Sequence, residues 1–443
     1  MSFPHWAKWL IPGMGVKRWF LLFVFSLFVL SLGFVCLLGP QGSKFLYQRL
    51  FFHLFDRPVL GALFLILGLA GSVYGFQRFI RSVLGALLPR GAGSLAQALY
   101  EARILKQAPK VVAVGGGTGL PTVLRGLKHY TANISAVVTM MDTGGSSGRL
   151  RAELDVLPPG DVRNCLLALA EDEARMERFL QYRFEAGEGL KGHALGNLLL
   201  AGLEQALGSF DLAVEEASHL LSVRGEVLPA TLDRVQLVGV MEDGGEVVGE
   251  ESLARDPRRV VRVRLSRPAK AYPPVLRAIA EADLIVLGPG SLFTSIIPNL
   301  LVEGIADAIE EAAAEKVVVM NLMTQPGETE GFSASDHLRV LAEYVDLRRF
   351  HAVVVNTETP PPHVLERYRS EGSEPVQDDL WGPKAFGLRV IRAPLLSVVE
   401  LEGKPTIKHD PVKLARVLVE ETGAFRRSWT RWFTPGPEAG NGG

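Results

Sequence analysis

Two long hydrophobic runs lie near the start of the chain, and shorter hydrophobic runs alternate with amphipathic stretches in the rest. The first run, Trp19 to Leu38, has no charged residue, and the second extends from Pro58 to Phe76. At about 1.5 Å per residue, a helix of about twenty residues spans the 30 Å hydrocarbon core of a bilayer. The pattern therefore predicts a transmembrane helical hairpin over residues 19–80, with spans at about 19–38 and 58–77.

Basic residues flank both predicted spans and also lie between them, so the positive-inside rule does not fix the orientation. A hairpin places residues 1–18 and the large C-terminal region on one side, and a main domain with a single cysteine, Cys165, fits the reducing cytosol. We therefore expect a multi-pass protein of the bacterial inner (cytoplasmic) membrane with its main domain in the cytoplasm. A cleaved signal peptide and a buried core hairpin are the alternatives. Gly71 and Gly75 have the G-x-x-x-G spacing that lets two spans pack closely.

After a linker helix predicted over 81–108, β-branched runs alternate with helical patterns. The predicted strands are 111–114, 134–141, 283–288, 316–323 and 351–356, with helices at 161–172, 195–207 and 304–314. This alternation is typical of an α/β fold, a Rossmann-like, mostly parallel sheet with helices on both faces. We place this domain at 109–424.

Two further segments depart from the alternation. Within 227–265, the stretches 235–241, 246–253 and 258–265 are strand-like, and Asp-Gly-Gly at 243–245 predicts a hairpin turn. We therefore expect a small antiparallel excursion from the main sheet. The tail, 425–443, begins with arginines and aromatic residues that could rest on a membrane surface, and its end is predicted to be disordered.

Composition excludes several classes of function. The net charge of −1 and the pI of 6.8 provide no basic field for nucleic acid. The two cysteines, Cys36 and Cys165, have no partner at metal or redox spacing, so we expect neither a disulfide framework nor a zinc site.

A glycine-rich loop follows the first predicted strand of the domain. Its residues are Gly115, Gly116, Gly117, Thr118 and Gly119, and a helical pattern comes next. Such a loop lets the backbone approach a phosphate, and the N–H groups of the helix start favour an anion. No Gly-Lys-Ser/Thr follows, so this is not a Walker A loop, and Leu120 replaces the third glycine of the dinucleotide fingerprint. The loop predicts phosphate binding, with a tight turn as the alternative.

Polar residues also follow the second predicted strand and begin the helices after it. Candidate ligand-binding residues here are Asp142, Gly145, Ser146, Ser147, Arg163, Asn164, His193 and Asn197. A solvated Gly/Ser turn is the alternative for the loop, but two such loops after consecutive strands favour ligand binding. Asp161 is expected to cap a helix, and a lone His193 is more often structural than catalytic.

The third and fourth strand-end loops provide uncharged polar groups. Gly288, Gly290, Ser291 and Thr294 suit a phosphate or a sugar, and Asn321 and Gln325 suit hydroxyls or a base edge. Glu328 and Asp336 are explained by loop solvation and a helix cap. Because parallel strands end at one edge of a sheet, all four loops are expected to converge on one ligand. The sequence has no Ser-His-Asp pattern and no metal cluster, so the catalytic residues are unknown; Asp142 is the one candidate.

These motifs resemble the YvcK-type gluconeogenesis-factor family, relatives of the archaeal 2-phospho-L-lactate transferases. The blocks that carry the resemblance run in order from about Lys110 to about Thr422: VGGGTGLPTVLRGLK, TGGSSGRLR, LPPGDVRNCLLAL, GHALGNLLLAGL, GPGSLFTSIIPNLLV and NLMTQPGETEGFSASDH. The resemblance implies binding of UDP-sugars, notably UDP-N-acetylglucosamine, with a dinucleotide as a further ligand and no required cofactor. It also implies a role in cell shape and carbon-source adaptation, with envelope-synthesis proteins or a second copy of the chain as partners.

Two further family positions fall on Tyr368 and Lys408, which the resemblance assigns to uracil stacking and to the diphosphate. The family usually has arginine at the second position, so a bidentate contact becomes a point charge. Relatives also have two consecutive acids where this chain has Asp142 and Thr143, which weakens the enzyme interpretation. The hairpin lies outside the family's common core. Three hypotheses follow: a UDP-sugar-binding regulator, a phospho- or nucleotidyl-transferase, and a nicotinamide-dependent redox enzyme, which the missing third glycine disfavours.

Overall fold

The computed structural model describes residues 16–37, 57–87, 105–401 and 403–426. Its chain divides into two compact units, Met1–Ala102 and Arg103–Gly443. The predicted segment 1–18, most of the linker helix and nearly all of the tail lie outside the described residues.

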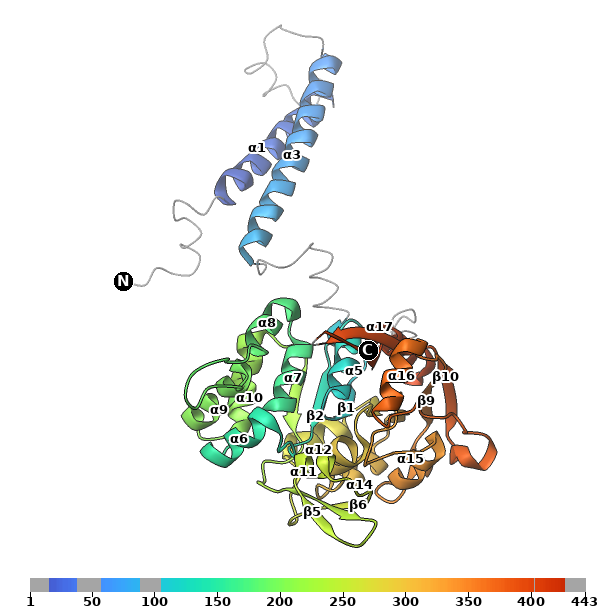
Figure 1. Cartoon of the computed structure of the whole chain (residues 1–443). Coiled ribbons are helices and arrows are strands. Elements are labelled where there is room, and N and C mark those ends of the chain that lie inside the picture. The colour runs from blue at the N-terminus through green and yellow to red at the C-terminus, as the bar shows by residue number, and fades with distance from the viewer. Residues whose placement is uncertain (1–15, 38–56, 88–104, 402, 427–443) are drawn as a thin grey trace, which may run out of the picture. The chain divides into compact units, whose positions relative to one another are not determined.

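The first unit contains two helices, α1 (Val16–Leu37) and α3 (Arg57–Leu87), packed side by side (Figure 1). Among the described residues, one helix is long and apolar enough to cross a membrane, at Gly61–Phe79; the apolar stretch of α1, Trp19–Phe34, is shorter. The predicted close packing at Gly71 and Gly75 is confirmed. A Cβ atom at Gly71 would collide with the Ser26 side chain, and one at Gly75 would lie 3.0 Å from the Phe23 backbone nitrogen.

The second unit is built on a seven-stranded parallel sheet, which confirms the predicted α/β fold. Its strands are β1 (Val111–Gly115), β2 (Ile134–Val138), β3 (Glu226–Pro229), β7 (Leu284–Leu287), β8 (Glu315–Val319), β9 (Ala352–Asn356) and β10 (Arg389–Ala393). They lie in the order β10-β9-β8-β7-β1-β2-β3. The order reverses between β1 and β7, which is where open α/β sheets bind ligands.

Both faces of this sheet are buried. Successive side chains of a strand point to opposite faces, and each face is covered by its own hydrophobic cluster. Val111 and Ala113 of β1 belong to one hydrophobic cluster, and Val112 and Val114 belong to the other. The first cluster includes residues of α5 (Gly119–Leu127), α7 (Gly160–Leu169), α10 (Phe210–Leu221) and α17 (Pro411–Glu421). The second includes residues of α12 (Pro273–Ala280), α13 (Ile297–Leu300), α14 (Ile305–Glu311) and α15 (Ala334–Leu341). Phe425 is buried in the first cluster, so the core extends one residue past the expected boundary at 424.

The remaining helices are α6 (Gly145–Leu154), α8 (Glu173–Leu180), α9 (Leu195–Leu207), α11 (Glu250–Arg255) and α16 (Pro362–Ser370). Short helical turns occupy Leu105–Gln107, Leu292–Ile296, Leu347–Arg349 and Gly382–Ala385.

The predicted antiparallel excursion is present as β4 (Leu237–Met241), β5 (Glu246–Val248) and β6 (Val260–Leu265), in the order β5-β4-β6. One part of that prediction is wrong: the strand expected over 246–253 stops at Val248, and α11 follows. A second small sheet, β11 (Leu396–Leu401) with β12 (Lys404–His409), was not predicted.

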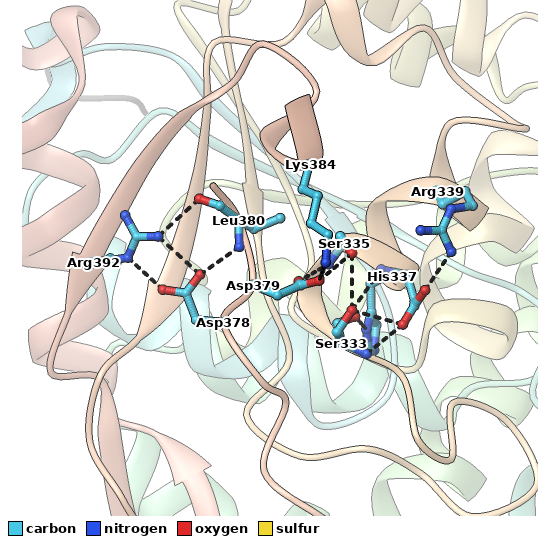
Figure 2. A network of polar contacts seen from close by, with 10 residues as sticks. Ser333, Ser335, His337, Arg339, Asp378, Asp379, Leu380, Lys384 and Arg392 are labelled. Carbon is cyan, nitrogen blue, oxygen red and sulfur yellow. Dashed lines mark hydrogen bonds and ion pairs between the residues drawn. The ribbon is translucent and has the colours of Figure 1, made fainter. Parts of the chain in front are cut away.

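A polar network ties the start of α15 to the segment that leads into β10 (Figure 2). Ser333 is the N-cap of α15 and forms a capping box with Asp336 at the third helical position, so the helix cap expected at Asp336 is shared with Ser333. Asp379 accepts hydrogen bonds from the Ser335 hydroxyl at 2.7 Å and from Lys384 Nζ at 2.9 Å. Burial alone would raise the pKa of Asp379, but these hydrogen bonds hold it below its usual value. The network therefore fixes the loop that carries the fourth strand-end motif.

Candidate functional site

The glycine loop after β1 packs directly on the loop after β7, at the reversal of strand order. A Cβ atom at Gly119 would overlap the carbonyl of Pro289 and would lie 3.0 Å from Gly290 N. Gly117 has a φ of +59°, a conformation that glycine adopts without strain. Close approach and a left-handed turn thus explain why glycines occupy these two positions.

Asp161, in the first turn of α7, binds the glycine loop. Its carboxylate accepts a hydrogen bond from Gly117 N at 2.7 Å, whereas the N-cap position of α7 is Pro159. The prediction that Asp161 is a plain helix cap is therefore wrong. Burial, followed by the neighbouring Asp142, raises the pKa of Asp161 to about 7.

A second carboxylate comes to Asp142 from a distant part of the chain. Burial and then Asp142 raise the pKa of Glu250, at the start of α11, to about 7. Thr143 Oγ1 accepts a hydrogen bond from Glu251 N at 3.1 Å, which helps to hold the start of α11 next to Asp142. Sequence reasoning missed Glu250 because 246–253 was expected to be a strand. Among the residues that the structure describes, no three His, Cys, Asp or Glu side chains are grouped as metal ligands.

The second loop and two later helices meet in a buried hydrogen-bond network. Ser146 Oγ lies 2.9 Å from His193 Nδ1 and accepts from Asn197 Nδ2 at 3.1 Å. Arg163 Nη1 donates to Asn197 Oδ1 at 2.7 Å. His193 precedes α9 rather than lying on it, since the helix begins at Leu195. Burial lowers the pKa of His193, which favours the neutral ring in this network.

The third and fourth loops brace each other. Gly290 N donates to Asn321 Oδ1 at 3.1 Å, and Ser291 hydrogen-bonds to both Thr294 and Glu328. Glu328 is 4 % exposed, so the expectation that it is a solvated loop residue is wrong.

A cavity of about 340 Å³, here called the smaller cavity, opens between these loops. Its lining includes Thr118, Gly119, Thr122, Gly290, Ser291, Asn321, Thr324, Gln325, Tyr368, Ile407, Lys408 and His409. The start of α5 at Gly119 therefore adjoins the cavity, and a helix start favours anions. Tyr368 is held in the wall by a hydrogen bond from Ile407 N to its hydroxyl, at 3.0 Å.

A second space of about 850 Å³, here called the larger cavity, adjoins the first. Both are lined by Thr118, Thr122, Glu371, Lys408 and His409. The larger cavity lies among α5, α7, α8, α16 and the β11–β12 hairpin. Burial, followed by the charge of Arg125, lowers the pKa of Lys408.

The predicted site residues thus fall into three groups. Those that line a cavity are Thr118, Gly119, Arg163, Asn164, Gly290, Ser291, Asn321, Gln325, Tyr368 and Lys408. Those that line neither cavity but lie in or next to the strand-end loops are Gly115, Gly116, Gly117, Asp142, Gly145, Gly288 and Thr294. Ser146, Ser147, His193 and Asn197 lie in the buried network.

Comparison with known proteins gives one consistent family. The sequence profile of the 2-phospho-L-lactate transferase CofD family matches residues 111–396. The gluconeogenesis factor of Bacillus subtilis is 45 % identical over 71 % of this chain and 98 % of its own length. A crystal structure of a protein from Bacillus halodurans is 45 % identical and covers 71 % of this chain and 100 % of that one, with a TM-score of 0.67.

A relative from Nostoc sp. is 41 % identical over 94 % of this chain and 92 % of its own length. An alignment of that extent must include most of Met1–Ala102, so the N-terminal unit is matched in this longer relative. The B. subtilis relative is matched over 98 % of its own length but covers only 71 % of this chain, in line with a hairpin outside the family's common core. The chain belongs to the gluconeogenesis-factor family, which is related to the 2-phospho-L-lactate transferase CofD.

Proposed function

We propose that this protein binds a nucleoside diphosphate sugar, UDP-N-acetylglucosamine, in the crevice at the reversal of strand order. One observation carries the proposal: Tyr368 and Lys408, from α16 and β12, line the same cavity as the glycine loop. An aromatic ring, a cation and a helix start are the groups that recognise a base and a diphosphate.

The chemistry of the smaller cavity assigns the parts of the ligand. Tyr368 offers a ring for the uracil, and Gln325 and Asn321 offer amides for its polar edge. The diphosphate lies at the junction of the cavities, beside Thr118, Thr122 and Lys408. Within the described part of the chain the Lys408 side chain makes no hydrogen bond or ion pair, so its charge is available to an anion.

In this proposal the protein is a binding regulator that couples the supply of the sugar nucleotide to envelope synthesis, cell shape and carbon-source adaptation. The α1–α3 hairpin anchors it in the inner membrane, beside the enzymes that consume the nucleotide, with the α/β unit in the cytoplasm. The apolar helix Gly61–Phe79 and the glycine contacts between α1 and α3 support a hairpin that inserts as a unit.

A transferase reaction is the alternative, favoured by the CofD profile and by the carboxylates of Asp142, Asp161 and Glu250. Turnover separates the two functions. A regulator returns UDP-N-acetylglucosamine intact, whereas a transferase consumes a nucleotide-activated donor when Mg²⁺ and an acceptor are present.

Calorimetry and thermal unfolding with UDP-N-acetylglucosamine, GDP and NAD test the proposal. Ligand at a hundred times its Kd should stabilise the protein by about 2.7 kcal/mol. Tyr368→Ala and Lys408→Ala should each weaken binding of the uridine nucleotide by about tenfold or more, while Lys270→Ala, an exposed lysine that lines neither cavity, should not. A response to GDP or NAD but not to the uridine nucleotide would contradict the proposal.

A further inference from the structure

We propose that the larger cavity is a second anion site, which receives a carboxylate or phosphate next to the sugar end of the bound nucleotide. The inference rests on the proposed function, since it assumes that the nucleotide end occupies the smaller cavity. It extends that function by adding to the bound nucleotide a negative group, supplied either by the sugar or by a separate molecule.

Charge is the first argument. Six cations line the larger cavity: Arg125, Arg163, Arg183, Arg367, Lys404 and Lys408. Three carboxylates, Glu173, Glu177 and Glu371, line it as well, so the cations exceed the acids by three. Glu173 is already paired with Arg125 and with Lys128, which lies outside the lining. The cavity therefore has positive charge that the protein's own acids do not neutralise.

Unsatisfied donors are the second argument. Buried guanidinium nitrogens normally find an acceptor, because an unpaired buried donor has lost its hydrogen bonds to water without replacing them. In the described part of the chain, Arg163 Nε and Arg367 Nε and Nη1 are buried and have no hydrogen-bond partner. The nearest acid to Arg367, Glu371, lies 3.7 Å from Nε, beyond hydrogen-bonding distance. Arg163 donates through its two terminal nitrogens to Asn197 and Asn164, but its Nε has no acceptor. Arg163 and Arg367 therefore line the larger cavity with guanidinium groups that keep unpaired donors.

The repulsion among the cations points in the same direction. Burial and then Arg183 lower the pKa of Arg163, just as burial and then Arg125 lower that of Lys408. Like charges that lie close together repel one another, and an anion that binds between them reduces this repulsion.

Space is the third argument. Small-molecule sites commonly measure about 300–1,000 Å³. The smaller cavity, at about 340 Å³, lies at the bottom of that range, so a whole nucleotide sugar would extend beyond it. The larger cavity, about 850 Å³, begins at the shared residues Lys408 and His409, next to the proposed diphosphate position. A sugar attached to that diphosphate therefore enters the cationic space.

Two sources could supply the anion: an acidic group on the sugar itself, or a separate phosphate-bearing molecule beside a neutral sugar. UDP-glucose and UDP-glucuronate distinguish them, because they differ by one carboxylate in place of a hydroxymethyl group. Calorimetry on the full-length protein should give a Kd for UDP-glucuronate about tenfold lower, the ratio expected of one charge-assisted hydrogen bond. For a separate anion, UDP-glucose should instead bind about tenfold more tightly when inorganic phosphate is present at constant ionic strength.

Variants locate the effect. Arg367→Gln and Lys404→Gln should each reduce the preference, expressed as the ratio of the two Kd values, by several-fold, and Lys404 is exposed, so its substitution leaves the fold intact. Arg369→Gln is the matched control, because Arg369 lies on the same helix, pairs with Glu374 and lines neither cavity.

The outcomes separate this inference from the proposed function. Tight binding of UDP-glucose with neither a carboxylate preference nor a phosphate effect would overturn the second anion site and leave the nucleotide proposal standing. A preference that survives both variants would overturn it too. If neither UDP-sugar binds, the nucleotide proposal fails, and binding of inorganic phosphate alone, compared between Arg367→Gln and Arg369→Gln, still decides whether the cavity holds anions.

Discussion

The buried carboxylates next to Asp142 lower the stability of the folded protein by an amount that depends on pH. The pKa of Glu250 rises from 4.5 to about 7 in the folded protein, so the folded state binds a proton more tightly than the unfolded state does. The stability gained from that proton is complete below the unfolded pKa and is lost as the pH rises to about 7. Above that pH the buried charge remains, next to Asp142.

Glu250→Gln should therefore raise the free energy of unfolding at pH 8 by about 1–3 kcal/mol, and by much less at pH 5. Urea unfolding of residues 103–443 at the two pH values measures the difference. Glu246→Gln is the control, since Glu246 is an exposed partner of Arg264 and should change stability by less than about 0.5–1 kcal/mol. Equal effects of Glu250→Gln at both pH values would show that its pKa is not raised.

At the scale of elements, the contact between the glycine loop and the loop after β7 determines the shape of the crevice. Gly119→Ala should destabilise the α/β unit by about 1–3 kcal/mol, because the added methyl group overlaps the Pro289 carbonyl and must separate the loops. Thermal unfolding and nucleotide titration measure the two consequences.

Gly202→Ala is a suitable control for that substitution. Gly202 lies inside α9, and a Cβ atom there would have nothing within 4 Å. Alanine should stabilise the helix by about 0.5–1 kcal/mol. If Gly119→Ala behaved like Gly202→Ala, the loop contact would not be a constraint.

The elements also show which features can be predicted from sequence. β1, β7, β8 and β9 were predicted because they are buried on both faces and their apolar runs are continuous. β3 and β10 were missed because they are edge strands; β10 carries Arg389 and Arg392, whose ion pairs with Glu421 and Asp378 cannot be foreseen from spacing. β11 and β12 were missed because they are half exposed and pair only with each other.

The site follows the same division. Glycine loops at strand ends have a local signature, so their convergence was predictable. The second carboxylate beside Asp142 and the cations of the larger cavity come from segments up to about 280 residues apart, which only the tertiary structure brings together. Tyr368 and Lys408 were identified by family resemblance alone, because neither has a local motif.

At the scale of the whole molecule, our proposal places the helices of the first unit in lipid and the second unit in water. The full chain should sediment with membranes and resist extraction by sodium carbonate, because transfer of Gly61–Phe79 into lipid buries an apolar helix of which only 17 % of the residues are buried in the protein itself. Residues 103–443 should remain in the soluble fraction and retain the calorimetric response to UDP-N-acetylglucosamine. Release of the full chain by carbonate would contradict membrane spanning.

The strand order has a consequence for biosynthesis. Because β1 lies between β2 and β7, one edge of this central strand has no partner until residues 284–287 leave the ribosome. At about 5–20 residues per second, that delay lasts on the order of ten seconds or longer. The crevice is completed later still, when β12 is made at residues 404–409. In our proposal, nucleotide therefore cannot guide the early steps of folding and can only bind nascent chains that are almost finished, after the N-terminal hairpin has had time to enter the membrane.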